Sequence, residues 1–535
     1  MTSSTSKKRL SVSEIRDYVL AALAGFAGSF AFSPADQSYL IFLTLGVMFH
    51  FLYQRRHQTA KCWILLASLC FFTVFWIHTS MTEYSDVPMP VAVPVLIAFA
   101  FYLSCYHALV IHLANRIFCG QMFIKNILAI PAGFILADYA AGHILTGFPW
   151  VYIGYTQIDT LFRNLAPIAG VHAITLTLLV ISGLVYHSFY TRKLWYTAAS
   201  LLITVLISLC EHTYTEEGSK IQVALVQGNI QQQIKWDPSK AEEIFSTYYD
   251  LSRSYFRGES TADLLVWPES ALPELENNIH ELLYKLDELA HMHGFAFITG
   301  VQTFQPAANS YYNAVIGLGL QDPEGESYYM RLAGNRYYKR HLVPVGEMVP
   351  DFMRHFGTFF NMPMSSFSRG SSIQENITAK GTRIATAICY EVAFPDEMQI
   401  NIHDETSLLL SVSNDGWFGT SNRETGDYHV SDGPYQHATI ARMRTLEFQK
   451  PMIRATNNGF TAIFDADGRT QSALPFYQEG VLQDRVVTRT GSTPFGTYGF
   501  TVVLSVVFGM LLIAFSHLLI LMITTTRKKK NKSGS

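Results

Sequence analysis

The sequence predicts two parts in different surroundings: an α-helical membrane domain of about eight transmembrane helices and an extracytoplasmic α/β domain. Charged residues make up only 15% of the 535 residues, whereas soluble domains carry roughly 25%. Long apolar runs fill the beginning and the end of the chain, and a long polar segment separates the last two runs. Most runs approach the ~20 residues that a spanning helix needs. They are residues 16–33, 38–53, 62–79, 90–114, 126–145, 166–186, 195–211 and 498–525.

Lysine and arginine in the short loops orient these runs, because both residues accumulate on the cytoplasmic side. Lys7, Lys8 and Arg9 place the N-terminus in the cytoplasm. If successive runs cross the membrane in alternating directions from there, the other loops that carry Lys or Arg also lie in the cytoplasm, with Arg163 as the exception. We therefore expect seven membrane helices in residues 1–211 and an extracytoplasmic domain in 212–496. The last membrane helix and a basic cytoplasmic tail should occupy 497–535.

The polar segment has the pattern of alternating strands and helices. Short apolar stretches bounded by Gly, Pro, Asn or Asp predict buried strands, and apolar residues at helical spacing predict helices. The strands are residues 222–227, 264–267, 296–301, 314–318, 383–389, 408–413, 452–456 and 461–465. The helices are residues 238–256, 278–291 and 436–448. Such an order predicts a layered α/β domain with functional residues at the strand ends.

Three residues of this domain predict chemistry together. Cys389 ends a predicted strand and is the only cysteine between Thr213 and the last apolar run. Glu269 directly follows another strand, and Lys339 begins a stretch rich in proline and glycine. A disulfide needs a second thiol within reach, and Cys389 has no obvious mate. The other five cysteines lie in or beside apolar runs, where cysteine usually acts as a small hydrophobe.

The three side chains offer a nucleophile, a base and a cation. A thiol with a pKa of about 8.5 is mostly protonated at neutral pH, so Cys389 needs help to form a thiolate. Glu269 could remove the proton, while Lys339 and the backbone N–H of Tyr390 could stabilise the oxyanion. Such a site would perform acyl transfer through a thioester. A single buried cysteine is more often part of a core than a nucleophile, so the prediction rests on the three residues jointly.

In their order and local contexts these residues resemble the Glu-Lys-Cys triad of the nitrilase (carbon-nitrogen hydrolase) superfamily. With membrane spans on both sides, the chain is similar to the bacterial apolipoprotein N-acyltransferase family. Further matching stretches are residues 146–150, 226–230, 235–237, 341–344 with 346–347, 413–419 and 441–444.

The resemblance implies a nitrilase-like αββα sandwich on eight membrane helices, in the bacterial inner membrane with the sandwich in the periplasm. It also implies transfer of the sn-1 acyl chain of a phospholipid, typically phosphatidylethanolamine, through a thioester enzyme intermediate. The acceptor would be the free α-amino group of the diacylglyceryl-cysteine of an apolipoprotein, and a lysophospholipid would be released.

Family roles carry over residue by residue: Glu269 as base, Lys339 as oxyanion stabiliser and Cys389 as nucleophile. The resemblance implies supporting or substrate-binding roles for Trp236, Glu347, Tyr390 and Glu391. On the residues alone, Glu347 could be a solvated acid, because acids on surface loops usually are. Tyr390 and Glu391 could equally make structural hydrogen bonds at the strand end.

The chain departs from the family pattern at a few positions. Val345 stands where the family usually has Phe, and Asp138, Tyr139 and Ala141 replace a commoner Glu, Trp and Arg. The loss of Arg at position 141 puts headgroup preference in doubt. Residues 348–367 are too apolar for an ordinary exposed loop, which predicts a lid at the membrane interface. Burial of this segment in a core is the alternative.

Other classes of function fit less well. The histidines form no cluster with zinc-like ligand spacing. The sequence contains no Gly-rich phosphate loop. The formal charge of −3 also argues against nucleic-acid binding, which needs a basic surface. We therefore expect no cofactor and no metal. A membrane-tethered nitrilase-like amidase or thioesterase, in which water resolves the acyl-enzyme, shares the triad and is poorly separated by sequence. A transporter or receptor that only binds is disfavoured by the ordered Glu, Lys and Cys.

Overall fold

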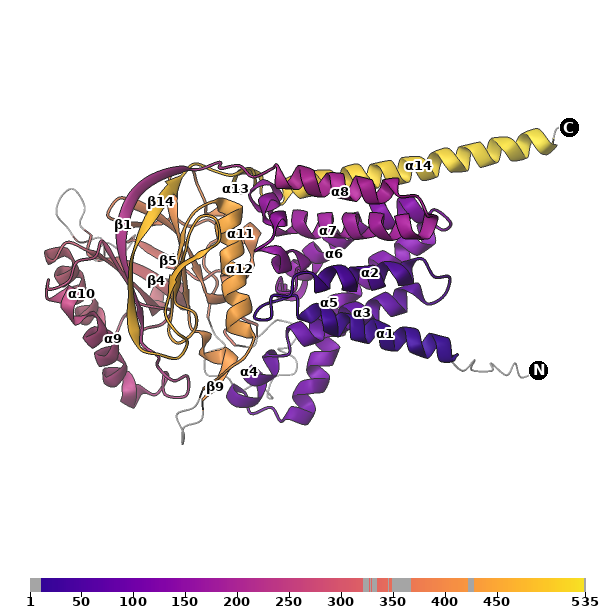
Figure 1. Ribbon diagram of the computed structural model, residues 1–535. Helices are drawn as coiled ribbons and strands as arrows, with labels where there is room; N and C mark the ends of the chain where they lie inside the picture. Colours follow the sequence, from indigo (N-terminus) through magenta and orange to yellow (C-terminus); the bar gives the residue numbers. More distant parts are fainter. Residues whose placement is uncertain are drawn as a thin grey trace.

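The structure, a computed structural model, describes residues 11–320, 327, 329, 334–344, 346–348, 367–421 and 428–533. Figure 1 shows a bundle of helices beside an α/β region, with both ends of the chain at the end of the bundle that faces away from the α/β region. The last helix returns along the bundle after the α/β region is complete. Helical and α/β regions of the kind expected from the sequence are both present.

Apolar helices from the N-terminal part of the chain form most of the bundle. Ser11 starts the first of them through a capping box, in which its side chain accepts from the Glu14 N–H and the Glu14 carboxylate accepts from the Ser11 N–H. The helices are α1 (Val12–Ser29), α2 (Leu40–Leu52), α3 (Gln58–Thr73), α4 (Ile77–Tyr84), α5 (Met89–Ile117), α6 (Ile130–His143), α7 (Ala166–Thr191), α8 (Trp195–Ser208) and α14 (Thr501–Ser533).

Several of these helices have the length and composition of membrane spans. In the described part of the chain, four stretches qualify, namely Met89–Ile117, Ile124–Thr146, Leu161–Thr191 and Thr501–Lys528. A fifth span is possible if α3 and α4, which are bent by 52° at their junction, cross the membrane together. Helices α2 and α8 are apolar but shorter. The chain is thus a membrane protein with several apolar helices, and the number of eight spans stays a prediction.

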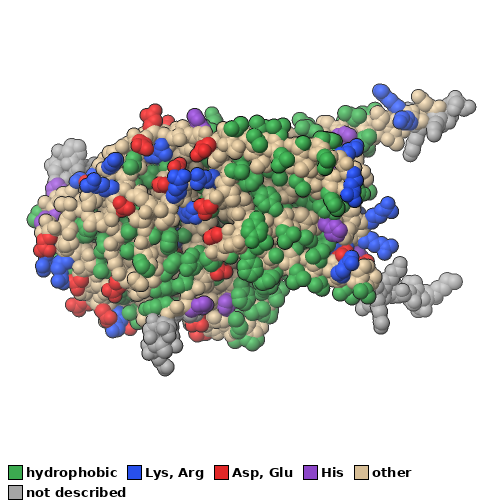
Figure 2. Space-filling view, viewed as in Figure 1, with side chains coloured by type: hydrophobic (Ala, Val, Ile, Leu, Met, Phe, Trp, Pro, Cys, Tyr) green, Lys and Arg blue, Asp and Glu red, His purple; other side chains and the backbone are tan. Residues whose placement is uncertain are grey.

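The outer surface of the bundle differs from that of the α/β region. Figure 2 shows hydrophobic side chains spread over the bundle, whereas the acidic and basic side chains are scattered mainly over the α/β region. Basic side chains reappear at the far end of the bundle, near the chain termini. An apolar surface of this size on a folded protein indicates contact with lipid or another partner.

Two six-stranded sheets form the centre of the α/β region. One sheet has the order β14-β1-β2-β3-β4-β5, and the other has the order β13-β12-β11-β8-β7-β6. The first consists of β1 (Glu216–Gln227), β2 (Leu264–Val266), β3 (Ala296–Gln305), β4 (Ser310–Leu318), β5 (Arg336–Tyr338) and β14 (Gly480–Thr490). The second consists of β6 (Ile377–Ala379), β7 (Thr382–Ile388), β8 (Thr406–Ser413), β11 (Met452–Thr456), β12 (Ala462–Phe464) and β13 (Thr470–Ala473). Strands β9 (Gly419–Ser421) and β10 (Tyr428–Val430) pair antiparallel in a separate two-stranded sheet.

Side-chain burial defines four layers. Alternate residues of both sheets, such as Val223 and Leu410, pack in one shared core between them. The outer face of the first sheet packs on α9 (Ala241–Phe256) and α10 (His280–Met292). The outer face of the second sheet packs on α11 (Pro395–Ile400) and α12 (Gly433–Phe448). The region is therefore a nitrilase-like sandwich of helix, sheet, sheet and helix, as expected.

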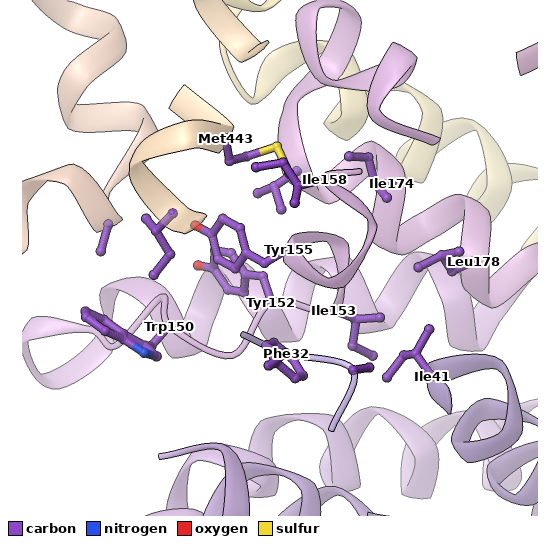
Figure 3. Packing of buried hydrophobic residues seen from close by; sticks show 14 of the residues in the cluster. Phe32, Ile41, Trp150, Tyr152, Ile153, Tyr155, Ile158, Ile174, Leu178 and Met443 are labelled. Carbon is purple, nitrogen blue, oxygen red and sulfur yellow. The ribbon is translucent and has the colours of Figure 1, made fainter. Parts of the chain in front are cut away.

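The α11–α12 layer joins the sandwich to the bundle. Met443 of α12 belongs to the same buried cluster as Ile158 and Ile174 of the helical region, and Figure 3 shows these side chains together. Trp150 lies at the edge of the same view, and its indole N–H donates to Gln436 of α12 at 2.8 Å. The face of the sandwich that carries α12 is therefore the face that meets the bundle.

All eight strands and three helices expected in the polar segment overlap observed elements. Several further strands were missed, the longest being β14, which pairs antiparallel with β1 along its length. Its buried and exposed side chains follow no regular alternation, and most of them are partly exposed. Its sequence therefore shows neither the apolar run nor the strict alternation that predicts a strand.

Candidate active site

The three proposed catalytic residues follow strand ends. Glu269 lies three residues beyond β2, Lys339 directly follows β5, and Cys389 directly follows β7. Strands β2 and β5 belong to one sheet and β7 to the other, so the site lies where both sheets end. Gly300 of β3 allows the Glu269 loop to approach, because a Cβ there would lie 2.8 Å from the Glu269 Cα.

Lys339 lies between two carboxylates. Its Nζ donates to Glu347 Oε1 at 2.8 Å and to Glu269 Oε1 at 3.2 Å. The amide of Asn313 donates to the same two oxygens, at 2.8 Å for Glu269 and 3.1 Å for Glu347. All four side chains are buried. Glu347 is therefore a buried acid in direct contact with Lys339 rather than a solvated one.

Glu269 has further partners that sequence reasoning did not single out. Its Oε2 accepts from the backbone N–H of Asn414 at 2.9 Å, and its backbone oxygen accepts from Lys235 Nζ at 3.0 Å. Lys235 is 1% exposed. It belongs to the matched stretch 235–237 and could have been noticed there as a second cation. Nothing in the sequence marked Asn313 as a site residue, because an asparagine within a strand is not distinctive by itself.

Burial and charge set the resting protonation states. Burial raises the pKa of the Cys389 thiol to about 12, with the Glu269 carboxylate adding to this effect and Lys339 opposing it. Burial would raise the pKa of Glu269, but Lys339 and Lys235 outweigh it and the pKa is lowered. For Lys339, burial would lower the pKa, but the two carboxylates raise it well above the ordinary value. The resting site therefore holds a thiol, a carboxylate and an ammonium.

Lys235 responds differently from Lys339. Burial lowers the pKa of Lys235 to about 8, even though Glu269 and Cys389 oppose that change. Its ammonium lies 5.7 Å from the centroid of the Trp236 ring, within the range of a cation–π contact. Trp236, a predicted substrate-binding residue, thus lies beside a buried cation of the site.

Cys389 occupies a sharp turn. Its φ is +54°, a left-handed conformation that costs a residue with a side chain about 1–3 kcal/mol and persists only where the surroundings hold it. Glu391 helps to hold it, because its two carboxylate oxygens accept the N–H groups of Ile388, Arg340 and His341 at 2.6–3.1 Å. Its Oε1 also accepts from the Tyr337 hydroxyl at 3.1 Å. Glu391 thereby ties the turn at Cys389 to the segment around Lys339.

Tyr390 points away from the sandwich. Its hydroxyl donates to the backbone oxygen of Gly147 at 3.1 Å, and its ring lies 6.3 Å from Phe148 and 6.2 Å from Trp150. Phe148 also lines a pocket in the bundle, together with Leu69, Leu103, His107, Asp138 and Ala141. The residue after Cys389 is therefore in contact with a segment of the bundle that borders an apolar pocket.

Two expectations fall outside the described residues. Val345 and residues 349–366 of the expected lid 348–367 are not described. Among the described residues, no group of three or more His, Cys, Asp or Glu side chains has the arrangement of a metal site. The described side chains of the site are donors and acceptors for one another.

Comparison with known proteins covers most of the chain. A model of the carbon-nitrogen hydrolase family matches residues 222–494. A model of the apolipoprotein N-acyltransferase N-terminal domain matches residues 24–184. The apolipoprotein N-acyltransferase of Vibrio cholerae is 37% identical over 492 residues, which are 90% of this chain and 93% of that protein. That of Shewanella oneidensis is 35% identical over 527 residues, 95% of this chain and 96% of that protein.

Solved structures also resemble part of the chain. A CN-hydrolase superfamily protein from Xanthomonas campestris aligns with a TM-score of 0.34 and 19% identity. The alignment covers 50% of this chain and 91% of that one.

Proposed function

Because the chain belongs to the apolipoprotein N-acyltransferase family, we propose that it transfers an acyl chain from a phospholipid to an apolipoprotein. The donor is the sn-1 chain, with phosphatidylethanolamine as the expected phospholipid. The acceptor is the free α-amino group of the diacylglyceryl-cysteine. Cys389, Lys339 and Glu269 carry the reaction, and no cofactor takes part.

One observation supports this chemistry most directly. A buried ammonium, Lys339, contacts Glu269 within 3.2 Å, and both groups act on the pKa of a thiol held at a left-handed turn. A thiol that is protonated at rest can be a nucleophile only if a base accepts its proton during attack. Glu269 is that base, since its lowered pKa keeps it ionised.

Acylation begins when Glu269 takes the Cys389 proton and the sulfur attacks the sn-1 ester carbonyl carbon. The oxyanion that forms is stabilised by the Lys339 ammonium and the Tyr390 backbone N–H. When the intermediate collapses, the ester C–O bond breaks, and the leaving alkoxide of the lysophospholipid takes the proton from Glu269. A thioester on Cys389 remains.

Transfer reverses the proton movements. The neutral α-amine of the acceptor attacks the thioester carbonyl, Glu269 accepts the amine proton, and the C–S bond breaks to release the thiolate. The proton then returns from Glu269 to the sulfur. Because the product is an amide, this step is strongly favourable and completes the lipoprotein.

The shape of the molecule fits a donor that stays in the bilayer. The apolar outer surface of the bundle (Figure 2) lets residues 1–211 and the last helix, within 497–535, lie in lipid. Residues 212–496 form the catalytic domain, which we place on the periplasmic side of the inner membrane with both termini in the cytoplasm. Helix α1 and the shorter helices α2 and α8 complete the eight spans. Tyr390 and Phe148 then bring the reactive thiol near an apolar pocket of the bundle.

A labelling experiment tests the proposal. Protein purified in detergent and incubated with phosphatidylethanolamine labelled in the sn-1 chain should retain label in a hydroxylamine-sensitive bond. Cys389→Ser should lose this label, whereas the matched variant Cys210→Ser should keep it. Label that persists in Cys389→Ser, or that never forms on the parent protein, contradicts the mechanism.

Addition of a diacylated lipopeptide then separates the transferase from the alternative hydrolase. The chain should leave Cys389 and appear on the α-amine of the peptide. Release as free fatty acid, at the same rate with and without the peptide, would instead identify a membrane-tethered amidase or thioesterase.

A further inference from the structure

His437 of α12 is a fully buried histidine outside the proposed triad, and it contacts the nucleophile turn. Its Nε2 lies 3.1 Å from the backbone oxygen of Cys389. Its exposed fraction is 0%, as are those of the Arg454 and Asp415 side chains behind it. His437 therefore connects a buried charged pair to the residue that carries the thiol.

The surroundings decide which ring nitrogen holds the proton. Arg454 Nη2, which can only donate, lies 2.9 Å from His437 Nδ1. The Cys389 backbone oxygen, which can only accept, lies at Nε2. Only a neutral ring with its proton on Nε2 satisfies both neighbours, since a proton on Nδ1 would face the Arg454 N–H.

Asp415 completes this arrangement. Arg454 Nη2 donates to Asp415 Oδ2 at 2.9 Å and Oδ1 at 3.2 Å, and the Ser413 hydroxyl donates to Oδ1 at 2.6 Å. The same Oδ1 lies 3.2 Å from His437 Nδ1. Arg454 Nη2 donates to both of these atoms, so no proton on Nδ1 is needed to link them. Burial lowers the pKa of His437, and the Arg454 charge adds to this, so the ring stays neutral.

We infer that His437 is a positioning residue that orients and polarises the Cys389–Tyr390 peptide group, whose N–H is the oxyanion donor of the proposed reaction. The inference rests on the proposed function and adds a residue to it. The donor on Nε2 holds the carbonyl end of this peptide, and the amide plane then fixes the direction of the Tyr390 N–H at the other end. A hydrogen bond to the carbonyl also strengthens the N–H as a donor, because hydrogen bonds in a chain polarise one another.

His437 also helps to stabilise the left-handed conformation of Cys389. A φ of +54° is held only if neighbouring groups fix the backbone on both sides. Glu391 fixes the N–H of Ile388 before the turn, and His437 fixes the oxygen of Cys389 after it.

Two reactions of the same thiol test the inference. Acylation passes through an oxyanion, whereas alkylation by iodoacetamide does not. His437→Met removes the donor at nearly constant length, and His437→Gln restores a donor in about the same place. Loss of a whole oxyanion donor slows enzymes about 10²–10³-fold; since His437 acts through the donor, we expect the Met variant to acylate about tenfold or more slowly. Its alkylation rate should fall much less than its acylation rate, because alkylation depends on the position of the thiol but not on the oxyanion donor. The Gln variant should recover most of the acylation rate.

The outcomes are distinct. Equal slowing of acylation and alkylation in the Met variant would show that His437 only holds the thiol in place and would overturn the inference, as would an unchanged acylation rate. If the Met variant does not fold, His437→Asn replaces it, because its shorter amide reaches Arg454 but not the Cys389 oxygen, and it should behave as the Met variant is expected to. Failure of the parent protein itself to acylate would refute the proposed function, which is a separate result.

Discussion

The bundle and the sandwich differ in the side chains that cover their outer surfaces. On the sandwich, acidic and basic side chains are scattered over the surface (Figure 2). In the bundle, Leu202 and Leu512 are 59% and 69% exposed. An exposed leucine costs free energy in water but not in hydrocarbon. The contrast teaches that the outer surfaces of the two regions are suited to different solvents, hydrocarbon for the bundle and water for the sandwich.

The largest effect should come from neutralising one charge in the sandwich. Glu269→Gln should slow acylation about 10²–10⁴-fold, the usual contribution of a general base. The same change should speed alkylation of Cys389 by iodoacetamide, because the Glu269 charge helps to raise the pKa of the thiol. With that pKa at about 12, the thiolate fraction of the parent protein, and so its alkylation rate, should rise about tenfold per pH unit between pH 7 and 9.

Both rates can be followed by mass spectrometry on the same preparations. Glu281→Gln, an exposed acid at the start of α10, is the matched control and should change neither rate. A parallel fall of acylation and alkylation in Glu269→Gln would mean that Glu269 serves only to hold Lys339.

A smaller effect should follow from placing a charge on the bundle surface. Leu512→Arg puts a cation on the lipid-facing side of α14 and should cost about 3 kcal/mol of membrane insertion. Ile373→Arg is the matched control, since Ile373 is 68% exposed but lies beside β6 of the sandwich, where water is the solvent. Retention in membranes during alkaline carbonate extraction should fall for Leu512→Arg alone. Equal behaviour of the two variants would contradict the assignment of different solvents.

The smallest effect should arise where the two regions meet. Tyr390→Phe removes one hydrogen bond, from the Tyr390 hydroxyl to the Gly147 oxygen, and should lower the free energy of unfolding by about 0.5–1.5 kcal/mol. Thermal unfolding in detergent measures this loss, with Tyr311→Phe, at a residue that is 40% exposed, as control. An unchanged melting temperature would show that the bond does not help to join the regions.

Structural features that depend on a local pattern of residues could be predicted from the sequence. Glu269, Lys339 and Cys389 could be proposed from the sequence only as a set, because each is a weak signal alone and the order and local contexts of all three resemble a known triad. Their partners Asn313 and His437 could not, because they reach the site through pairing of β4 and packing of α12. The break between α3 and α4 was missed for a similar reason: residues 62–79 are continuously apolar, and hydropathy does not show a bend of 52°.

Strands β1 and β14, through which the chain enters and leaves the sandwich, are hydrogen-bonded neighbours. The sandwich is therefore an insertion carried on two adjacent covalent tethers, one from α8 and one to α14. Two tethers side by side restrict swivelling about the membrane normal, which a single linker would permit. The sandwich is thus tied to the bundle at two points rather than one.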